Sequence, residues 1–106
     1  MINYTTPTIS LVVEGVNISD SDVYVSIEQG KTELTKSGAD LTITTETVQQ
    51  VTNTLISFTL TQQESALFDY DRNADIQVNW IKNGVRGATR IETVHVLRNL
   101  LNEVIE

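Results

Sequence analysis

The sequence predicts an all-β domain, an antiparallel immunoglobulin-like β-sandwich with one short helix near residues 62–68. Short stretches of alternating apolar and polar residues recur along the chain, and turn-forming residues separate them about every ten residues, as in β-sandwiches. Threonine is frequent and valine and isoleucine are common, and these β-branched side chains favour strands. The dipeptide Asn83-Gly84 lies between two alternating stretches and favours a tight hairpin turn.

We expect several short strands in the first half of the chain, after a polar and loose start at residues 1–6. Alternation predicts strands at 8–13, 23–28, 32–36 and 41–45. Within the second of these, Tyr24 falls on the outer face. Residues 46–54 leave three interpretations open, namely an extension of the preceding strand, a bulge, or a mobile loop.

A clear strand is predicted at residues 55–60, and the periodicity changes directly after it. Thr61 and Glu64 have the spacing of a capping box. In this motif the threonine hydroxyl accepts the amide hydrogen of the glutamate, and the carboxylate accepts the amide hydrogen of the threonine. The sequence therefore predicts a short helix within residues 62–68, followed by a polar loop at 69–73.

The segment 74–98 predicts a β-hairpin around Asn83-Gly84. Apolar residues alternate with polar ones in its first arm, so we expect Trp80 to pack in the core. Gly87 marks a bulge or bend in the second arm. Residues 91–98 predict the last strand.

The composition indicates a single domain, residues 1–106, with an acidic surface. Fourteen acidic and seven basic residues give a net charge of −7, and such a surface repels phosphate backbones, so we expect no nucleic acid as a partner. The chain contains no cysteine, which excludes disulfides and thiolate metal sites. The first residues do not resemble a signal peptide. No apolar run approaches the ~18 residues of a membrane span, so we expect synthesis in the cytosol and no membrane partner.

One acidic segment has the spacing of a calcium loop. Residues 69–75, DYDRNAD, place oxygen-bearing side chains at alternate positions, as in a loop that curls around one Ca²⁺ ion. The pattern then fails, because Ala74 and Trp80 stand where such a loop has a glycine and a bidentate acid. We therefore expect a solvated loop and neither a metal nor another cofactor.

Residue patterns for catalysis are also weak, so we expect no enzyme and no catalytic residues. His95 is the only histidine, and no serine or threonine lies in a nucleophile-elbow pattern. Acid pairs at 20–22 and 103–106 fall in a turn and at a terminus, without a cluster of aromatic residues around them. Residues 84–87 are flanked by predicted strands, so they do not form a phosphate-binding loop.

A carbohydrate- or cell-surface-binding module is the alternative function on the same fold. Such modules usually expose several aromatic rings that stack on sugars, whereas only 6% of this chain is aromatic. An exposed and coplanar arrangement of Tyr24, Tyr70 and Trp80 would favour this alternative.

Three segments give the chain a family resemblance. The strings LTITTE, ISFTLTQQESALF and IQVNWIKNGVRGATRIETVHVLRNLL resemble small phage and prophage proteins of Gram-positive bacteria that are encoded among tail and baseplate genes. The resembling region covers most of residues 8–105. The resemblance implies a non-enzymatic structural protein of the tail or baseplate, found in the virion once assembled. Its implied partners are other tail or baseplate proteins, or further copies of the same chain.

The end of the chain is apolar enough to dock on another surface. The expected docking residues for a partner are Leu100, Leu101, Val104 and Ile105. Alternatively, this segment forms a final strand or helix that packs on the chain's own sandwich. The sequence leaves both interpretations open.

Overall fold

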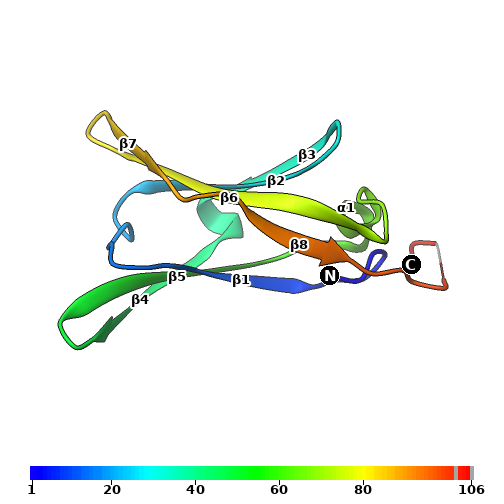
Figure 1. Ribbon diagram of the computed structural model, residues 1–106, viewed down its shortest axis with the longest axis horizontal. Helices are drawn as coiled ribbons and strands as arrows, with labels where there is room; N and C mark the ends of the chain where they lie inside the picture. Colours follow the sequence, from blue (N-terminus) through cyan, green and yellow to red (C-terminus); the bar gives the residue numbers. More distant parts are fainter. Residues whose placement is uncertain (102, 106) are drawn as a thin grey trace.

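The computed structural model describes residues 1–101 and 103–105 and confirms the predicted β-sandwich. Two antiparallel sheets face each other, one with three strands and one with five (Figure 1). The strands are β1 (Thr8–Val13), β2 (Asp22–Gln29), β3 (Thr32–Ser37), β4 (Thr42–Val48), β5 (Val51–Thr59), β6 (Arg72–Lys82), β7 (Val85–Ala88) and β8 (Glu92–Val96). A 3₁₀ turn, η1 (Gly38–Asp40), and a helix, α1 (Gln62–Ala66), connect them.

The strand order is that of an immunoglobulin domain. The orders β1-β5-β4 and β3-β2-β6 correspond to strands B-E-D and C′-C-F of that fold. β7 and β8 both pair with β6 and share the place of strand G. No described strand occupies the place of strand A beside β1.

The N-terminal residues are held at the end of β8. Ile2 forms a parallel bridge with Leu97, and Asn3 is buried, with its backbone N–H donating to the carbonyl of Leu97 over 3.1 Å. The expectation of a loose start at residues 1–6 is therefore wrong, because the first residues complete backbone hydrogen bonds that β8 would otherwise lack.

The core between the sheets follows from the strand alternation. In β2, Val25 and its alternate neighbours are buried, while Tyr24 is exposed on the outer face as predicted. A polar residue, Thr54, is also fully buried. Its hydroxyl donates to the carbonyl of Val16 over 2.8 Å and accepts from the N–H of Ile18 over 3.0 Å. These bonds attach the β1–β2 connection to β5.

The predicted capping box begins α1. The Thr61 hydroxyl accepts from the Glu64 N–H over 3.1 Å, and the Glu64 carboxylate accepts from the Thr61 N–H over 2.9 Å. Lys36 of β3 forms an ion pair of 2.7 Å with the same carboxylate. The helix is shorter than the predicted 62–68, because the chain leaves it to bury Phe68 in the core.

Within residues 46–54, residues 46–48 extend the preceding strand, which was the first of the three interpretations, and residues 51–54 begin the next strand, β5. β4 and β5 pair continuously up to Val48 and Val51 and form a hairpin that projects from the sandwich (Figure 1). The turn residues Gln49 and Gln50 have φ values of 50° and 67°. A tight type I′ turn requires this left-handed conformation, although glycine or asparagine usually provides it.

The predicted hairpin around Asn83-Gly84 is confirmed, and both turn residues have positive φ. Trp80 is half-buried and packs against the core, with its ring over Gly87 on β7. A Cβ atom built on Gly87 would lie 2.5 Å from this ring. Gly87 pairs with Trp80 in regular register, so the predicted bulge or bend at this glycine is wrong. A glycine is needed here because any side chain would overlap the Trp80 ring.

The interruption in the second arm lies at residues 89–91 instead. There the Thr89 N–H donates to the carbonyl of Val78 over 2.9 Å, and the Thr89 hydroxyl accepts from the Val78 N–H over 3.1 Å. Pairing with β6 then resumes in β8, which is shorter than the predicted strand at 91–98. A threonine side chain thus replaces one step of the ladder.

Candidate interaction surfaces

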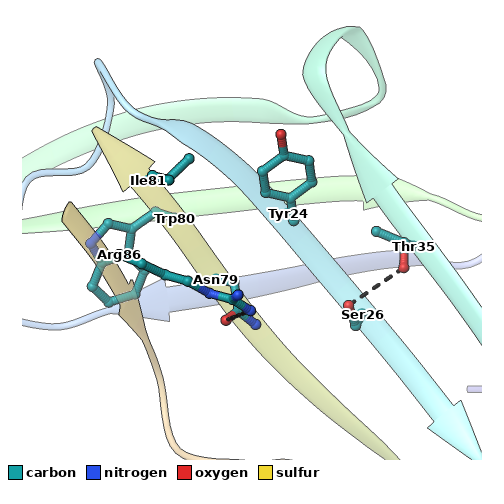
Figure 2. A pocket seen from close by; sticks show the side chains of 7 residues that line it. All are labelled: Tyr24, Ser26, Thr35, Asn79, Trp80, Ile81 and Arg86. Atoms are coloured by element: carbon teal, nitrogen blue, oxygen red, sulfur yellow. Dashed lines mark hydrogen bonds between the residues drawn. The ribbon is translucent and has the colours of Figure 1, made fainter. Parts of the chain in front are cut away.

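A hollow of about 420 Å³ lies on the outer face of the five-stranded sheet (Figure 2). Strand alternation produces it, because β2, β3, β6 and β7 each direct side chains away from the core at this point. Its lining residues are Tyr24, Ser26, Thr35, Asn79, Trp80, Ile81 and Arg86. We call this surface the outer hollow.

The outer hollow offers hydrogen-bonding groups beside an aromatic ring. Arg86 reaches across from β7, and its Nη2 donates to Oδ1 of Asn79 over 3.1 Å (Figure 2). The hydroxyls of Ser26 and Thr35 lie 3.4 Å apart. Among the described residues, Arg86 is the only charged one that lines the hollow. This combination suits a polar ligand that also has an apolar face, such as a sugar.

The three aromatic residues named for carbohydrate binding do not form one set. Tyr24 and Trp80 line the outer hollow, but Tyr70 precedes β6 at the other end of that strand. The part of β6 from Arg72 to Trp80 separates Tyr70 from the hollow, and its eight residue-to-residue steps span about 25 Å. Tyr70 lies instead under the guanidinium group of Arg98, 5.4 Å from the ring centroid. The coplanar arrangement that would favour a carbohydrate-binding module is therefore absent for these three rings.

An acidic row crosses the same outer face further along β2. Glu28 stands directly opposite Glu33 of β3 on one side and Asp75 of β6 on the other. Like charges at directly opposed positions destabilise a sheet, and this row also repels anionic partners such as nucleic acids. Among residues 1–101 and 103–105, no three acidic, histidine or cysteine side chains are arranged to hold a metal ion.

The segment with calcium-loop spacing does not curl around a common point. β6 begins at Arg72, so Asn73 and Asp75 lie on a strand. Asp69 forms an ion pair of 3.0 Å with Arg72. The Asn73 amide oxygen lies 3.0 Å from Nδ1 of His95, which is exposed on β8. The only histidine therefore takes part in a cross-strand contact with an amide.

The acid pairs noted in the sequence also have individual partners or exposed positions. Lys82 donates a hydrogen bond to Asp20, and this bond together with the lysine charge lowers the pKa of that carboxyl. Asp22 begins β2 opposite Ile81. Glu103 is exposed, whereas Glu106 lies outside the described residues.

The C-terminal arm, which we define as residues 99–101 and 103–105, lies outside the core. Leu100 is 87% exposed and Ile105 is 63% exposed; Leu101 is also exposed, and Val104 is half-buried. The Gln62 side chain donates to the carbonyl of Ile105 over 2.9 Å and accepts from its N–H over 2.8 Å. The described arm forms neither a strand nor a helix, and its three exposed apolar side chains are Leu100, Leu101 and Ile105.

A second depression, the lateral groove, runs between β1 and the junction of β7 and β8. It has a volume of about 410 Å³, and a smaller hollow of about 50 Å³ continues it towards the core residues Ile76 and Val78. Apolar and polar residues both line the groove, namely Val12, Val13, Glu14, Val16, Trp80, Ala88, Thr89, Arg90 and Glu92. Arg90 and Glu92 form an ion pair of 2.8 Å. The groove lies beside the edge of β1 at which no described strand takes the place of strand A.

Sequence reasoning located the arm but missed the outer hollow and the lateral groove. Alternation alone identifies Tyr24 and Ser26 as outward-facing residues. It does not give the long-range pairing that places them beside Asn79 and Arg86. The sequence does contain one indication of the groove. Val12 is an apolar residue at an outward position of the first strand, β1.

Comparison with protein-family models gives no match, and no curated protein matches the chain significantly. None of the helices in the described part of the chain is long and apolar enough to cross a membrane.

Proposed function

We propose that the protein is a non-enzymatic structural and interaction module of a phage tail or baseplate. It is made in the bacterial cytoplasm and carried in the virion. The uncovered C-terminal arm is the observation that carries this proposal, because Leu100 and Ile105 expose large apolar side chains. Burial of each on a partner contributes about 1.5–3 kcal/mol. The resemblance to tail and baseplate proteins is the reason for assigning the protein to that part of the phage particle.

In this proposal the protein binds its partners through complementary shape and charge, and it catalyses no reaction. The sandwich has open edges at β1, β3 and β4, and each can pair with an extended segment of a neighbouring protein. The net charge of −7 favours partners with basic patches and disfavours nucleic acid. A symmetric particle would hold many copies of this module.

Mass spectrometry of purified, induced particles tests the proposal. We expect the chain in intact particles, and we expect the double variant Leu100→Asp with Ile105→Asp to be excluded from them. Val85 is apolar and 73% exposed at the tip of the β6–β7 hairpin, so Val85→Asp is the matched control and should be incorporated normally. The proposal fails if the chain is missing from particles and deletion of its gene leaves tail formation unchanged.

A carbohydrate- or cell-surface-binding role is the second candidate, and the outer hollow favours it. The Tyr24 ring stands beside the hydroxyls of Ser26 and Thr35 and the guanidinium group of Arg86. This is a suitable arrangement for a sugar ring and its hydroxyl groups. Unlike the proposal above, it requires no contact with the arm.

Calorimetric titration with cell-wall polysaccharide of the host tests this second candidate, and it should give a saturable binding signal. The Trp80 ring packs against the core and over Gly87, so Tyr24 is the aromatic side chain on the outer face of the hollow. Tyr24→Ala should abolish the signal, whereas Tyr70→Ala should not, since Tyr70 lies outside the hollow. Equal effects of the two substitutions, or no signal for the unmodified protein, would exclude this role.

A further inference from the structure

Asn83 differs from the other asparagines of the chain in two ways. It is the only asparagine that is followed by a glycine in the sequence. Among residues 1–101 and 103–105, it is also the one asparagine whose side chain forms no hydrogen bond. The carboxamide oxygens of the others all have partners, namely those of Asn3, Asn17, Asn53, Asn73, Asn79 and Asn99.

The backbone nitrogen of Gly84, next to it, is equally accessible. Asn83 and Gly84 form the exposed turn beyond the last pair of the β6–β7 ladder, which joins Lys82 to Val85. No described residue accepts a hydrogen bond from the Gly84 N–H. A Cβ atom built on Gly84 would meet no atom within 4 Å, so no neighbouring segment hinders the approach of the Asn83 side chain to this nitrogen.

These two groups are the reactants of asparagine deamidation. The Gly84 nitrogen attacks Cγ of Asn83 and forms a C–N bond. The bond from Cγ to the side-chain nitrogen breaks, and ammonia leaves with the proton of the Gly84 N–H. The absence of a side chain on glycine makes this attack least hindered. Hairpin tips open locally at little cost in free energy, so the turn can flex as the attack requires.

The ring that forms is a five-membered succinimide, and water opens it in one of two ways. Attack of water at Cγ gives aspartate, with the backbone unchanged. Attack at the main-chain carbonyl carbon gives isoaspartate, in which the backbone continues through Cβ and Cγ. Solvent water is the only co-reactant, and no electrons are transferred to or from the chain.

We propose that Asn83 is a site of spontaneous deamidation and that its isoaspartate product releases β7 from β6. Isoaspartate adds one backbone atom to a type I′ turn, which requires two residues of ordinary backbone length. β7 has four residues, and β6 is its only partner among the described strands. β6 remains paired with β2 and β8, so β7 can detach without unfolding of the sandwich.

The aspartate product keeps the hairpin. Asp-Gly favours the same turn as Asn-Gly, so this product only adds one negative charge to a chain whose net charge is −7. Isoaspartate adds the same charge. A comparison of the two products therefore separates the effect of the charge from the effect of the longer backbone.

Detachment of β7 changes one end of the molecule. The Trp80 ring, which packs over Gly87, becomes exposed to water. Arg86 leaves the outer hollow, where its guanidinium group donates to Asn79 (Figure 2). Both chain termini lie at the other end of the molecule (Figure 1), so the C-terminal arm is unaffected. This inference goes beyond the proposed function and does not depend on it.

Peptide mass spectrometry of the purified full chain, aged at mildly alkaline pH, tests the site. The peptide that contains Asn83 should gain the mass of an amide-to-acid exchange, and an isoaspartyl methyltransferase should label part of it. Asn53 is the internal control, because it is followed by threonine and its side chain accepts from the Gly15 N–H. Conversion of Asn83 no faster than that of Asn53 would overturn the proposal.

Tryptophan fluorescence tests the release of β7. The emission of the aged chain should shift to longer wavelength in proportion to its isoaspartate content. Asn83→Asp should show no shift, because it carries the charge on an ordinary backbone. Aged Asn83→Gln should show none either, since glutamine does not form the five-membered ring, and Gln49 and Gln50 adopt positive φ in another turn of this chain. Isoaspartate without a shift, or an equal shift in Asn83→Asp, would refute the release.

Discussion

Replacement of Gly87 by alanine tests the contact between β7 and the single tryptophan. A Cβ at this position would lie 2.5 Å from the Cε2 and Cζ2 atoms of Trp80 and 2.6 Å from its Nε1. Ordinary carbon contacts are about 3.5–4.0 Å, so the indole ring must move by about 1 Å. The ring packs against the core, and the movement therefore disturbs packing beyond β7.

Two opposing terms set the magnitude. Overpacking of this kind costs about 1–3 kcal/mol. Gly87 has no positive φ, so alanine fits its backbone and stabilises by about 0.4–1 kcal/mol through the unfolded state. We expect Gly87→Ala to lower the free energy of unfolding by about 1–2 kcal/mol, with a melting temperature lower by about 4–8 °C for each kcal/mol.

Urea unfolding followed by circular dichroism measures this change in two backgrounds. Trp80→Leu removes the indole ring, so in that background Gly87→Ala should be neutral or stabilising. The coupling between the two substitutions should be about 2 kcal/mol. If Gly87→Ala has the same effect in both backgrounds, the contact with the ring does not determine the residue at position 87. Tryptophan fluorescence of Gly87→Ala should also shift, because the ring moves.

Three further substitutions test other parts of the fold, each in urea unfolding. Thr54→Val removes the acceptor of the Ile18 N–H and should destabilise by about 1–3 kcal/mol, since it leaves a buried donor unsatisfied; a neutral result would contradict that role. Gln50→Gly should stabilise by up to about 1 kcal/mol, because glycine adopts the positive φ of this turn without strain; a loss of stability would show that the side chain matters. Burial raises the pKa of Glu64, but hydrogen bonds from Lys36 and the Thr61 amide outweigh it and hold this pKa below its ordinary value of 4.5. Its stabilisation is therefore present above that pH and lost as the pH falls through the lowered pKa. The unmodified chain should lose more stability than Glu64→Gln between neutral pH and pH values below the lowered pKa, and equal losses would refute the assignment.

The sequence was sufficient for features that depend on nearby residues. The Asn83-Gly84 turn, the capping box at Thr61 and the outward position of Tyr24 all follow from local chemistry. The same reasoning failed at Gly87, because the reason for a glycine there is the ring of Trp80 on the neighbouring strand. The hairpin at Gln49-Gln50 was left open, since neither residue is one that usually forms a type I′ turn.

The candidate surfaces depend on pairing between distant strands, which composition and periodicity do not specify. Ser26 and Asn79 become neighbours only when β2 pairs with β6. The lateral groove exists because the N-terminal residues pair with Leu97 and not with β1. The docking role of Leu100 and Ile105 stays a prediction, because it depends on the apolar character of this segment in the sequence.

The central position of β6 has a consequence for how the chain folds. The β2–β3 and β4–β5 hairpins are local and can form early, but the Thr8–Thr59 contact joins residues 51 apart and the Asp20–Lys82 contact joins residues 62 apart. Topologies with such distant pairings fold in milliseconds to seconds. β2, β7 and β8 all pair with β6, so the five-stranded sheet closes only after the ribosome has released residues 72–82. Until then, the apolar side of β2 is exposed to chaperones and to other nascent chains.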